Sequence, residues 1–236
     1  MRAIRLSFFH MLKVVMHDRM LFAALMSPVL AGIAICFGVP FAEKMLIQVT
    51  GLTAVLTPYY GLFDIFFASL TAVMFCFIAA MVGLEEHDDH IDRYLFITSL
   101  GRNGYFVSRI LLPALFAFAI TAILLPGVKL TELSGVEIIL LSLTGSLQGI
   151  VIALLIVTIS SNKLEGMAVT KLFSLMILGA IVPFFLPSPI DLCAFFLPSF
   201  WMGKAVTERK PVVMLLSVLV AASWILCLKR KQDRKL

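Results

Sequence analysis

The sequence has little of the charge that a water-soluble enzyme needs. Only 14% of its 236 residues are charged, whereas 61% are hydrophobic, and the mean hydropathy is +1.05. Soluble domains carry about 25% charged residues, so this chain has too few to cover a soluble surface. The composition therefore excludes an ordinary soluble domain and predicts long apolar segments that cross a bilayer.

Cysteines are few and widely spaced. The four are Cys36, Cys76, Cys193 and Cys227, and no two of them form a CxxC pair. The regular spacing of secreted disulfide frameworks is absent, and three of the four lie in apolar runs, where cysteine behaves as a small hydrophobic residue. The sequence predicts no disulfide scaffold, with a single Cys36–Cys193 bond at the outer face as the alternative.

Motifs for chemistry are also missing. The sequence contains no GxxxxGK[ST] phosphate loop, no GxSxG and no HExxH. The chain therefore does not hold a nucleotide in the P-loop manner, and a serine or zinc hydrolase is disfavoured. We predict no catalytic residue, no metal and no cofactor within this chain. The net charge of +5 is better explained by membrane orientation than by nucleic-acid binding.

Apolar runs are abundant, and six of them approach the ~20 residues that a helix needs to cross hydrocarbon. We predict an all-α membrane protein with one transmembrane domain over residues 1–236. Its expected spans are residues 20–41, 58–84, 106–126, 136–160, 168–186 and 211–228. Residues 1–18 place apolar side chains on one helical face, which predicts an amphipathic helix along the membrane surface; the alternative is a ragged tail.

The charges are distributed asymmetrically between the two sides. With the N-terminus inside, fourteen of the 19 Lys and Arg residues lie on the inner side. The positive-inside rule then places both termini in the cytoplasm, which agrees with an even number of spans. Residues 187–205 form the last outer connection. Their apolar part, Leu192–Phe200, is too short to cross and predicts a re-entrant segment, with a packed apolar loop as the alternative.

Polar residues inside the spans are rare. Asp64 in the second span and Gln148 in the fourth are candidates for a substrate path. The alternative for Asp64 is a place at the outer interface beside Tyr59 and Tyr60. Small residues at helical spacing in the fourth span permit close helix approach, either within the chain or between two protomers. These small residues are Ser142, Gly145, Ser146 and Gly149.

The connection over residues 85–105 carries the densest group of charges. A charged run is followed by an apolar, aromatic patch and a glycine-containing turn, a pattern suited to docking into a groove of a partner protein. A metal site made by the histidines and carboxylates is the alternative. The predicted docking residues are Glu85, Glu86, Asp88, Asp89, Asp92, Arg93, Tyr94, Leu95, Phe96, Thr98, Ser99 and Arg102.

This layout resembles the permease subunits of ABC-2-type ATP-driven exporters. Those permeases have an amphipathic N-terminal helix, six spans, an acidic first cytoplasmic loop and an outer re-entrant element before the last span. The motif resemblance covers Leu84–Pro113: acidic Glu85-Glu86, an apolar run ending at Thr98, and Arg109 where a Lys opens the third span. Ser99 stands where that family commonly has Pro, and Ile91–Arg93 replace its Gly-Thr pair.

The resemblance implies a set of partners. A separate ABC ATPase subunit, carrying ATP and Mg, would bind the loop around Asp88–Arg102, and a second permease copy or a homologous permease would complete the transporter. The implied setting is the lipid of a bacterial cytoplasmic membrane, and the implied substrate is lipophilic or amphipathic, such as a drug or peptide. The alternatives are an ATPase-independent secondary transporter or channel, and a non-transporting immunity or accessory protein.

Overall fold

In the computed structural model, which describes residues 2–187 and 190–233, the chain is helical throughout, with no β-strand among these residues. Its helices are α1 (Arg2–His17), α2 (Arg19–Ile33), η1 (Ala34–Gly38), α3 (Val39–Thr50), η2 (Thr57–Tyr59), α4 (Tyr60–Asp88), α5 (Ile91–Ile97), α6 (Gly101–Phe106), η3 (Val107–Leu111), α7 (Leu112–Val128), α8 (Gly135–Ile159), α9 (Lys163–Ser174), η4 (Leu175–Ile181), α10 (Val182–Phe185), η5 (Ile190–Ala194), α11 (Pro198–Thr207) and α12 (Pro211–Asp233). Here η1 and η3 are π-helical turns, and η2, η4 and η5 are 3-10 helices.

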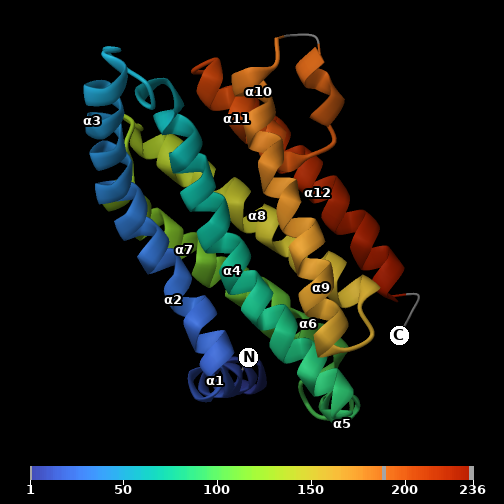
Figure 1. Cartoon of the computed structure of the whole chain (residues 1–236). Coiled ribbons are helices and arrows are strands. Elements are labelled where there is room, and N and C mark those ends of the chain that lie inside the picture. Colours follow the sequence, from blue (N-terminus) through green and yellow to red (C-terminus); the bar gives the residue numbers. More distant parts are fainter. Residues whose placement is uncertain (1, 188–189, 234–236) are drawn as a thin grey trace.

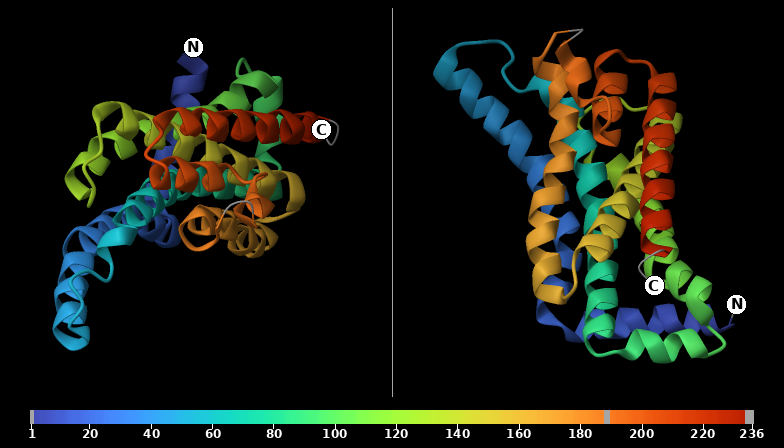
Figure 2. Two further views of the ribbon diagram at one scale, coloured as in Figure 1. Left: turned by 90° about the horizontal axis from the view of Figure 1, so that it is seen from above. Right: turned by 90° about the vertical axis from the view of Figure 1, so that its right-hand side faces the viewer.

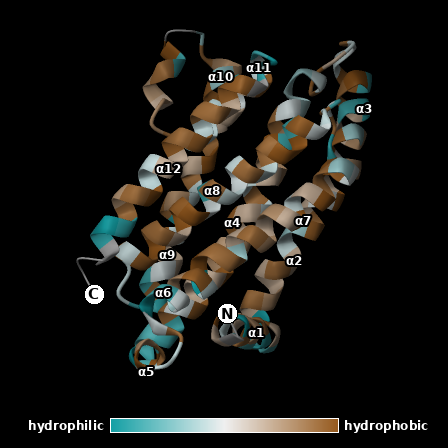
Figure 3. Cartoon of the chain, turned by 180° about the vertical axis from the view of Figure 1, so that it is seen from behind, coloured by the Kyte–Doolittle hydropathy of each residue, from teal (hydrophilic) through white to brown (hydrophobic). Residues whose placement is uncertain are grey.

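The long helices form one bundle (Figure 1). Among the described residues, six helical segments are long and apolar enough to cross a membrane, which confirms the predicted fold class. Hydrophobic residues predominate along their length, and hydrophilic residues lie toward the two ends, at α1, α5 and the end of α12 and at α3 and α11 (Figure 3). We call the end that carries α1 and α5 the α5 end, and the opposite end, with α10 and α11, the α11 end.

Helices α4 and α8 form the buried centre of the bundle because small residues let their backbones approach closely. A Cβ atom added at Gly145 would lie 3.0 Å from the carbonyl oxygen of Ala68, and one at Gly149 would lie 2.8 Å from that of Ala72. Gly145 and Gly149 therefore pack against α4 within the chain.

Replacing Gly149 with Ala is expected to destabilise the bundle by about 1–3 kcal/mol, because the new methyl would overlap backbone atoms of α4 that cannot rotate away. Gly127 in α7 is the matched control, since a Cβ there meets nothing within 4 Å. Gly127→Ala should leave stability unchanged or slightly raise it. Thermal unfolding of the detergent-solubilised variants checks both; equal melting temperatures for the two would contradict close packing at Gly149.

The first span is longer than the sequence predicts. It continues as one helical segment from Arg19 to Thr50, through the π turn η1, instead of ending near Phe41. The charged Glu43 suggests a helix end, but its carboxylate accepts hydrogen bonds from the backbone N–H of Val55 (3.0 Å) and the hydroxyl of Thr57 (2.9 Å). Because these bonds satisfy the buried charge, the helix continues until Gly51 caps it at positive φ.

The segment before the last span packs back into the α11 end of the bundle. Helix α11 lies against α12 and η4, and Phe200 and Met202 are fully buried there. Ser217 of α12 donates a hydrogen bond to the carbonyl oxygen of Pro198 at 2.8 Å, which fixes the start of α11. Of the predicted re-entrant residues 187–205, Ser188 and Pro189 lie outside the described residues.

Helix α1 lies across the α5 end, nearly perpendicular to the spans (Figure 2, right). Its buried face consists of Phe8, Met11 and Val15, at the helical spacing that the sequence predicts. At the corner with α2, Asp18 caps the next helix by accepting a hydrogen bond from the N–H of Met20 at 2.8 Å. Burial opposes ionisation of Asp18, but hydrogen bonds from two backbone N–H groups and Lys163 outweigh it and lower its pKa.

Candidate functional site

A short helix, α5, crosses the α5 end beneath the spans (Figures 1 and 2). It begins where His90 adopts a left-handed conformation (φ +58°), which ends α4 and turns the chain sideways. Gly101, also at positive φ (+64°), turns the chain back into α6. Two turns at positive φ therefore hold a seven-residue helix across the end of the bundle.

The outer face of α5 is apolar. Ile91, Tyr94 and Ile97 follow one another at three-residue spacing and expose 43%, 69% and 84% of their surface. Side chains at this spacing share one helical face, so the three form a continuous row. We call Ile91, Tyr94 and Ile97 the α5 row. Exposed apolar side chains on α1, such as Leu6 and Phe9, lie at the same end of the bundle. A cluster of exposed apolar side chains of this kind is typical of a protein-docking surface.

The inner face of α5 is anchored to the bundle. Asp92 is buried, and its carboxylate lies 2.7 Å from Nδ1 of His87 at the end of α4. The Phe96 ring meets the Tyr105 ring edge to face, with centroids 5.3 Å apart. Because α5 is held by α4 through Asp92 and by α6 through Phe96, a displacement of α5 has to move the ends of both helices.

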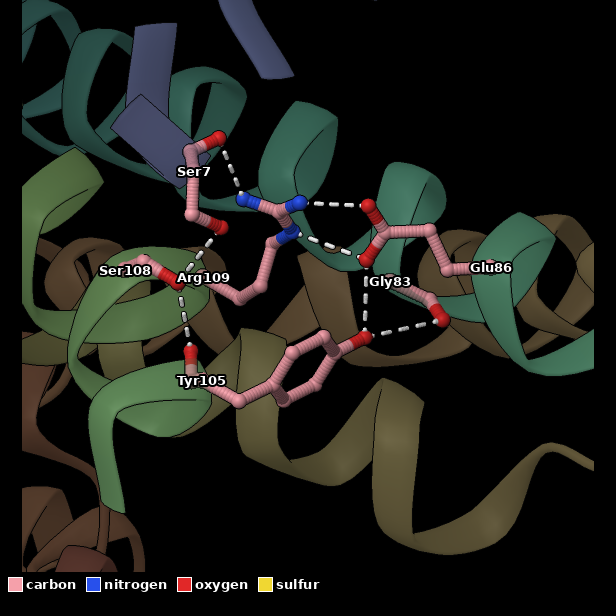
Figure 4. A network of polar contacts seen from close by, with 6 residues as sticks. All are labelled: Ser7, Gly83, Glu86, Tyr105, Ser108 and Arg109. Atoms are coloured by element: carbon pink, nitrogen blue, oxygen red, sulfur yellow. Dashed lines mark hydrogen bonds and ion pairs between the residues drawn. The ribbon is translucent and has the colours of Figure 1, made fainter. Parts of the chain in front are cut away.

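Behind α5 lies a buried ion pair between Glu86 of α4 and Arg109 of η3 (Figure 4). The guanidinium donates to both carboxylate oxygens, with Nε 2.9 Å from Oε2. Tyr105 donates its hydroxyl to the same Oε2 at 2.9 Å, and Arg109 donates Nη1 to the carbonyl oxygen of Ser7 in α1 at 3.0 Å. One fully hydrogen-bonded pair thus connects α1, α4 and the start of the third span.

The π turn η3 places Arg109. It covers Val107–Leu111 at the point where α6 becomes α7, and a π turn shifts the side chains that follow by part of a turn. Ser108 in the same turn lies beside Ser7, with hydroxyl oxygens 3.4 Å apart (Figure 4). The π turn in the third span therefore directs the side chain of Arg109 toward α4 and α1.

The connection between α8 and α9 reaches the same end. Lys163 at the start of α9 pairs with Glu85 of α4 (2.9 Å) and with Asp18 (3.2 Å), and its backbone N–H donates to Asp88 at 3.0 Å. These bonds explain why α4 continues to Asp88 although its last turn is strongly acidic. The predicted loop over residues 85–105 is consequently helical for most of its length.

The structure divides the predicted docking residues into buried, half-buried and exposed groups. Glu86 and Asp92 are buried and paired, so the expectation that they form a solvated docking surface is wrong. Glu85, Leu95 and Phe96 are half-buried, and Glu85 pairs with Lys163. The other predicted residues with an exposed surface are Asp88, Asp89, Arg93, Tyr94, Thr98, Ser99 and Arg102.

Several contributors to this end are absent from the predicted docking residues. They are Ile91 and Ile97 in the α5 row, Ser7, Tyr105 and Arg109 in the buried network, and His87 and Lys163, which pair with predicted residues. The three-residue spacing of Ile91, Tyr94 and Ile97 is a signal for the row. The contact of Ser7 with Arg109 runs through a backbone carbonyl, which no side-chain pattern reveals.

The two candidates for a substrate path are both buried within the chain. Asp64 is buried, and its carboxylate accepts hydrogen bonds from the N–H groups of Leu130 (2.8 Å) and Thr131 (3.0 Å) and from the Thr131 hydroxyl. It therefore ties the loop after α7 to the first turns of α4. Gln148 is fully buried in α8, and its amide has no hydrogen-bond partner among the described residues.

Metal ligands do not converge in the part of the chain that the structure describes. No group of three or more His, Cys, Asp or Glu side chains has the geometry to hold an ion there. His87 belongs to the charged run for which a metal site is the alternative. Its Nδ1 atom lies instead 2.7 Å from the carboxylate of Asp92. The four cysteines are free.

Comparison with known proteins places the chain among export permeases. The sequence profile of the family described as fluoroquinolones export permease protein Rv2686c-like matches residues 11–229. Fluoroquinolones export permease protein Rv2686c of Mycobacterium tuberculosis H37Rv is 26% identical over 197 residues, covering 80% of this chain and 75% of that protein, and protein MT2760 of strain CDC 1551 gives the same values. No solved structure gives a significant match. The chain therefore belongs to the Rv2686c-like family of export permeases, multi-pass membrane proteins.

Proposed function

We propose that this chain is the permease subunit of an ABC-2-type exporter and that a separate ATPase binds its α5 row. The carrying observation is the row itself: three exposed apolar side chains on a helix that is anchored, on its other face, to the ends of two spans. An apolar row on a short helix fits a hydrophobic groove of a partner. Membership of an export-permease family supports the same assignment.

The contacts suggest how force would pass into the membrane. ATP-driven closure of two ATPase subunits would push on α5 in each of two permease copies. Asp92 and Phe96 would carry that displacement to α4 and α6, and the Glu86–Arg109 pair would move α1 with them. Two conformations biased by ATP are sufficient for such a cycle, and no residue of this chain needs to perform chemistry.

The proposal extends to the orientation in the membrane and to the substrate class. The α5 end carries most of the Lys and Arg residues, so it faces the cytoplasm of a bacterial cell, with both termini inside. The apolar spans suit a lipophilic or amphipathic substrate, and the relatives are named for the export of fluoroquinolones. We therefore propose an amphipathic drug-like molecule as the cargo, with export as the direction.

Co-expression tests the proposal directly. The tagged chain is produced together with the proteins encoded beside its gene and purified from detergent-solubilised membranes. We expect an ATPase with a phosphate loop to co-purify and the complex to pump an amphipathic dye out of cells. Recovery of a transport-active assembly that contains no ATPase would contradict the proposal and favour a secondary transporter. Recovery of a stable chain without any transport would favour an accessory protein.

A further inference from the structure

A groove of about 560 Å³ separates α1 from α5 at the α5 end. Both helices run across this end of the bundle, and the last turns of α4 contribute a third wall (Figure 2, right). The volume lies within the range of pockets that hold drug-sized ligands. The groove is therefore large enough for one small amphipathic molecule beside the docking helix.

The walls of the groove are mainly apolar. Leu6 and Val14 contribute from α1, Val82 from α4, and Ile91 and Leu95 from α5. Two of these side chains remain open to the surroundings, since Leu6 exposes 62% of its surface and Ile91 exposes 43%. An occupant with an apolar body would cover this surface and remove it from water, which is favourable.

Carboxylates outnumber cations along the same walls. Glu85, Glu86 and Asp89 line the groove, against the guanidinium of Arg109 and the imidazole of His10. The charges of Glu86 and Arg109 cancel in the buried ion pair. The charge that an occupant meets is therefore set by Glu85, Asp89 and His10.

The acidic excess remains when ionic partners outside the walls are counted. Lys163 pairs with Glu85 but also with Asp18, so one ammonium group serves two carboxylates. Asp89 is exposed and has no ion pair among the described residues. The local set thus holds four carboxylates and two cations, and protonation of His10 would not remove the difference.

The other cations of α1 do not offset this excess at the walls. Arg5 and Lys13 are exposed, and neither lines the groove. Residues of α1 that do line it, such as Leu6 and Val14, are apolar apart from Ser7 and His10. The groove consequently combines an apolar lining with net negative charge, which is complementary to an amphipathic cation.

We propose that this groove binds a drug-sized amphipathic cation, with its apolar body on the exposed surfaces of Leu6 and Ile91 and its charge in the field of Glu85 and Asp89. The size of the groove favours a small molecule over a folded segment of a partner protein. Because Ile91 belongs to the α5 row, the bound molecule would also touch the docking helix. Identification of the cation as the exported cargo rests on the proposed function, whereas the binding itself does not.

Equilibrium dialysis of the full chain in phosphatidylcholine nanodiscs tests the proposal. The probes are 2-naphthylmethylammonium and its neutral counterpart 2-naphthylmethanol, and empty nanodiscs measure their partition into lipid. We expect saturable binding of both probes, with the cation bound about 10-fold more tightly than the alcohol. Equal affinities for the two probes, or no saturable binding of the cation beyond the empty nanodiscs, would overturn the proposal.

Two substitutions at the end of α4 test the charge. Asp89→Asn should weaken binding of the cationic probe about 5-fold and leave the neutral probe unchanged, because the carboxylate is exposed and its attraction is partly screened. Asp88→Asn is the matched control: it removes the same charge from the next position, which does not line the groove, and it keeps an oxygen that can accept the N–H of Lys163. Equal losses of cation affinity in the two variants would overturn the assignment of the site.

Two substitutions on α1 test the apolar wall. Leu6→Ala should weaken binding of both probes about 3-fold, since each places its ring on this side chain. Phe9→Ala is the control, because Phe9 is exposed to a similar degree (60%) but does not line the groove. Thermal unfolding should be the same in both variants, and equal affinities for the probes would contradict the proposed site. The measurement contains no ATPase, so failure to capture an ATPase would overturn the proposed function and leave this binding result standing.

Discussion

Replacing Arg109 with Met is expected to destabilise the protein by about 3–5 kcal/mol, because it leaves the Glu86 carboxylate buried without its ion partner. The hydrogen bond from Tyr105 would remain, but it cannot replace two charge-assisted bonds from a guanidinium. The substitution also removes the bond to Ser7, so α1 loses one of its polar contacts with the third span. Thermal unfolding in detergent should show a decrease on the order of 10 °C.

The double variant Glu86→Gln with Arg109→Met separates charge from packing. With no ion left behind, most of the stability should return, since an uncharged replacement of a buried pair is often close to neutral. Lys210→Ala is the surface control. The ion pair of Lys210 with Glu208 is exposed at the α11 end of the bundle and should contribute less than about 1 kcal/mol. A single Arg109 variant as stable as the unmodified protein would contradict the structural role of the pair.

The second large effect concerns the α5 row. Replacing Tyr94 and Ile97 with Ala is expected to weaken ATPase binding about 100-fold, because both side chains are exposed, apolar and central to the proposed contact. Folding should be unaffected, since neither residue is buried in the bundle. Affinity between the purified permease, in nanodiscs, and the ATPase is the quantity to measure.

Leu215 and Leu219 of α12 provide the matched control for this variant. They are exposed to a similar degree but lie on a span, where lipid covers them. Their replacement with Ala removes comparable apolar area and should leave ATPase affinity within about 2-fold. Equal losses for the two double variants would show that general destabilisation, not docking, accounts for the effect.

The apolar runs are sufficient to predict the architecture. Apart from a closed β-barrel, a helix is the only structure that forms all of its backbone hydrogen bonds internally in lipid. The six spans and the amphipathic α1 therefore follow from periodicity and length. Helix ends are less predictable where tertiary bonds satisfy a charge: Glu43 lies inside the first span because Val55 and Thr57 donate to it. Asp88 stays helical because Lys163 donates to it from another helix.

The site is predictable in place but not in detail. The density of charge over residues 85–105 indicates where the chain is specialised, yet charge alone does not distinguish a docking surface from a buried network. Glu86 and Asp92 look equivalent to Asp88 and Asp89 in the sequence, but their partners, Arg109 and His87, bury them. The π turn that aims Arg109 has no clear signal in the sequence. Which face of α5 is exposed depends on which of its sides Asp92 and Phe96 attach to the bundle.

Site-specific photo-cross-linking tests the central claim most directly. A photoreactive amino acid replaces Ile97 at the tip of the α5 row or, as a control, the equally exposed Val49 at the far end of the bundle. In cells that co-express the partner ATPase, we predict a permease–ATPase adduct from position 97 and none from position 49. An adduct from position 49, or transport without an adduct from position 97, would contradict ATPase docking on α5.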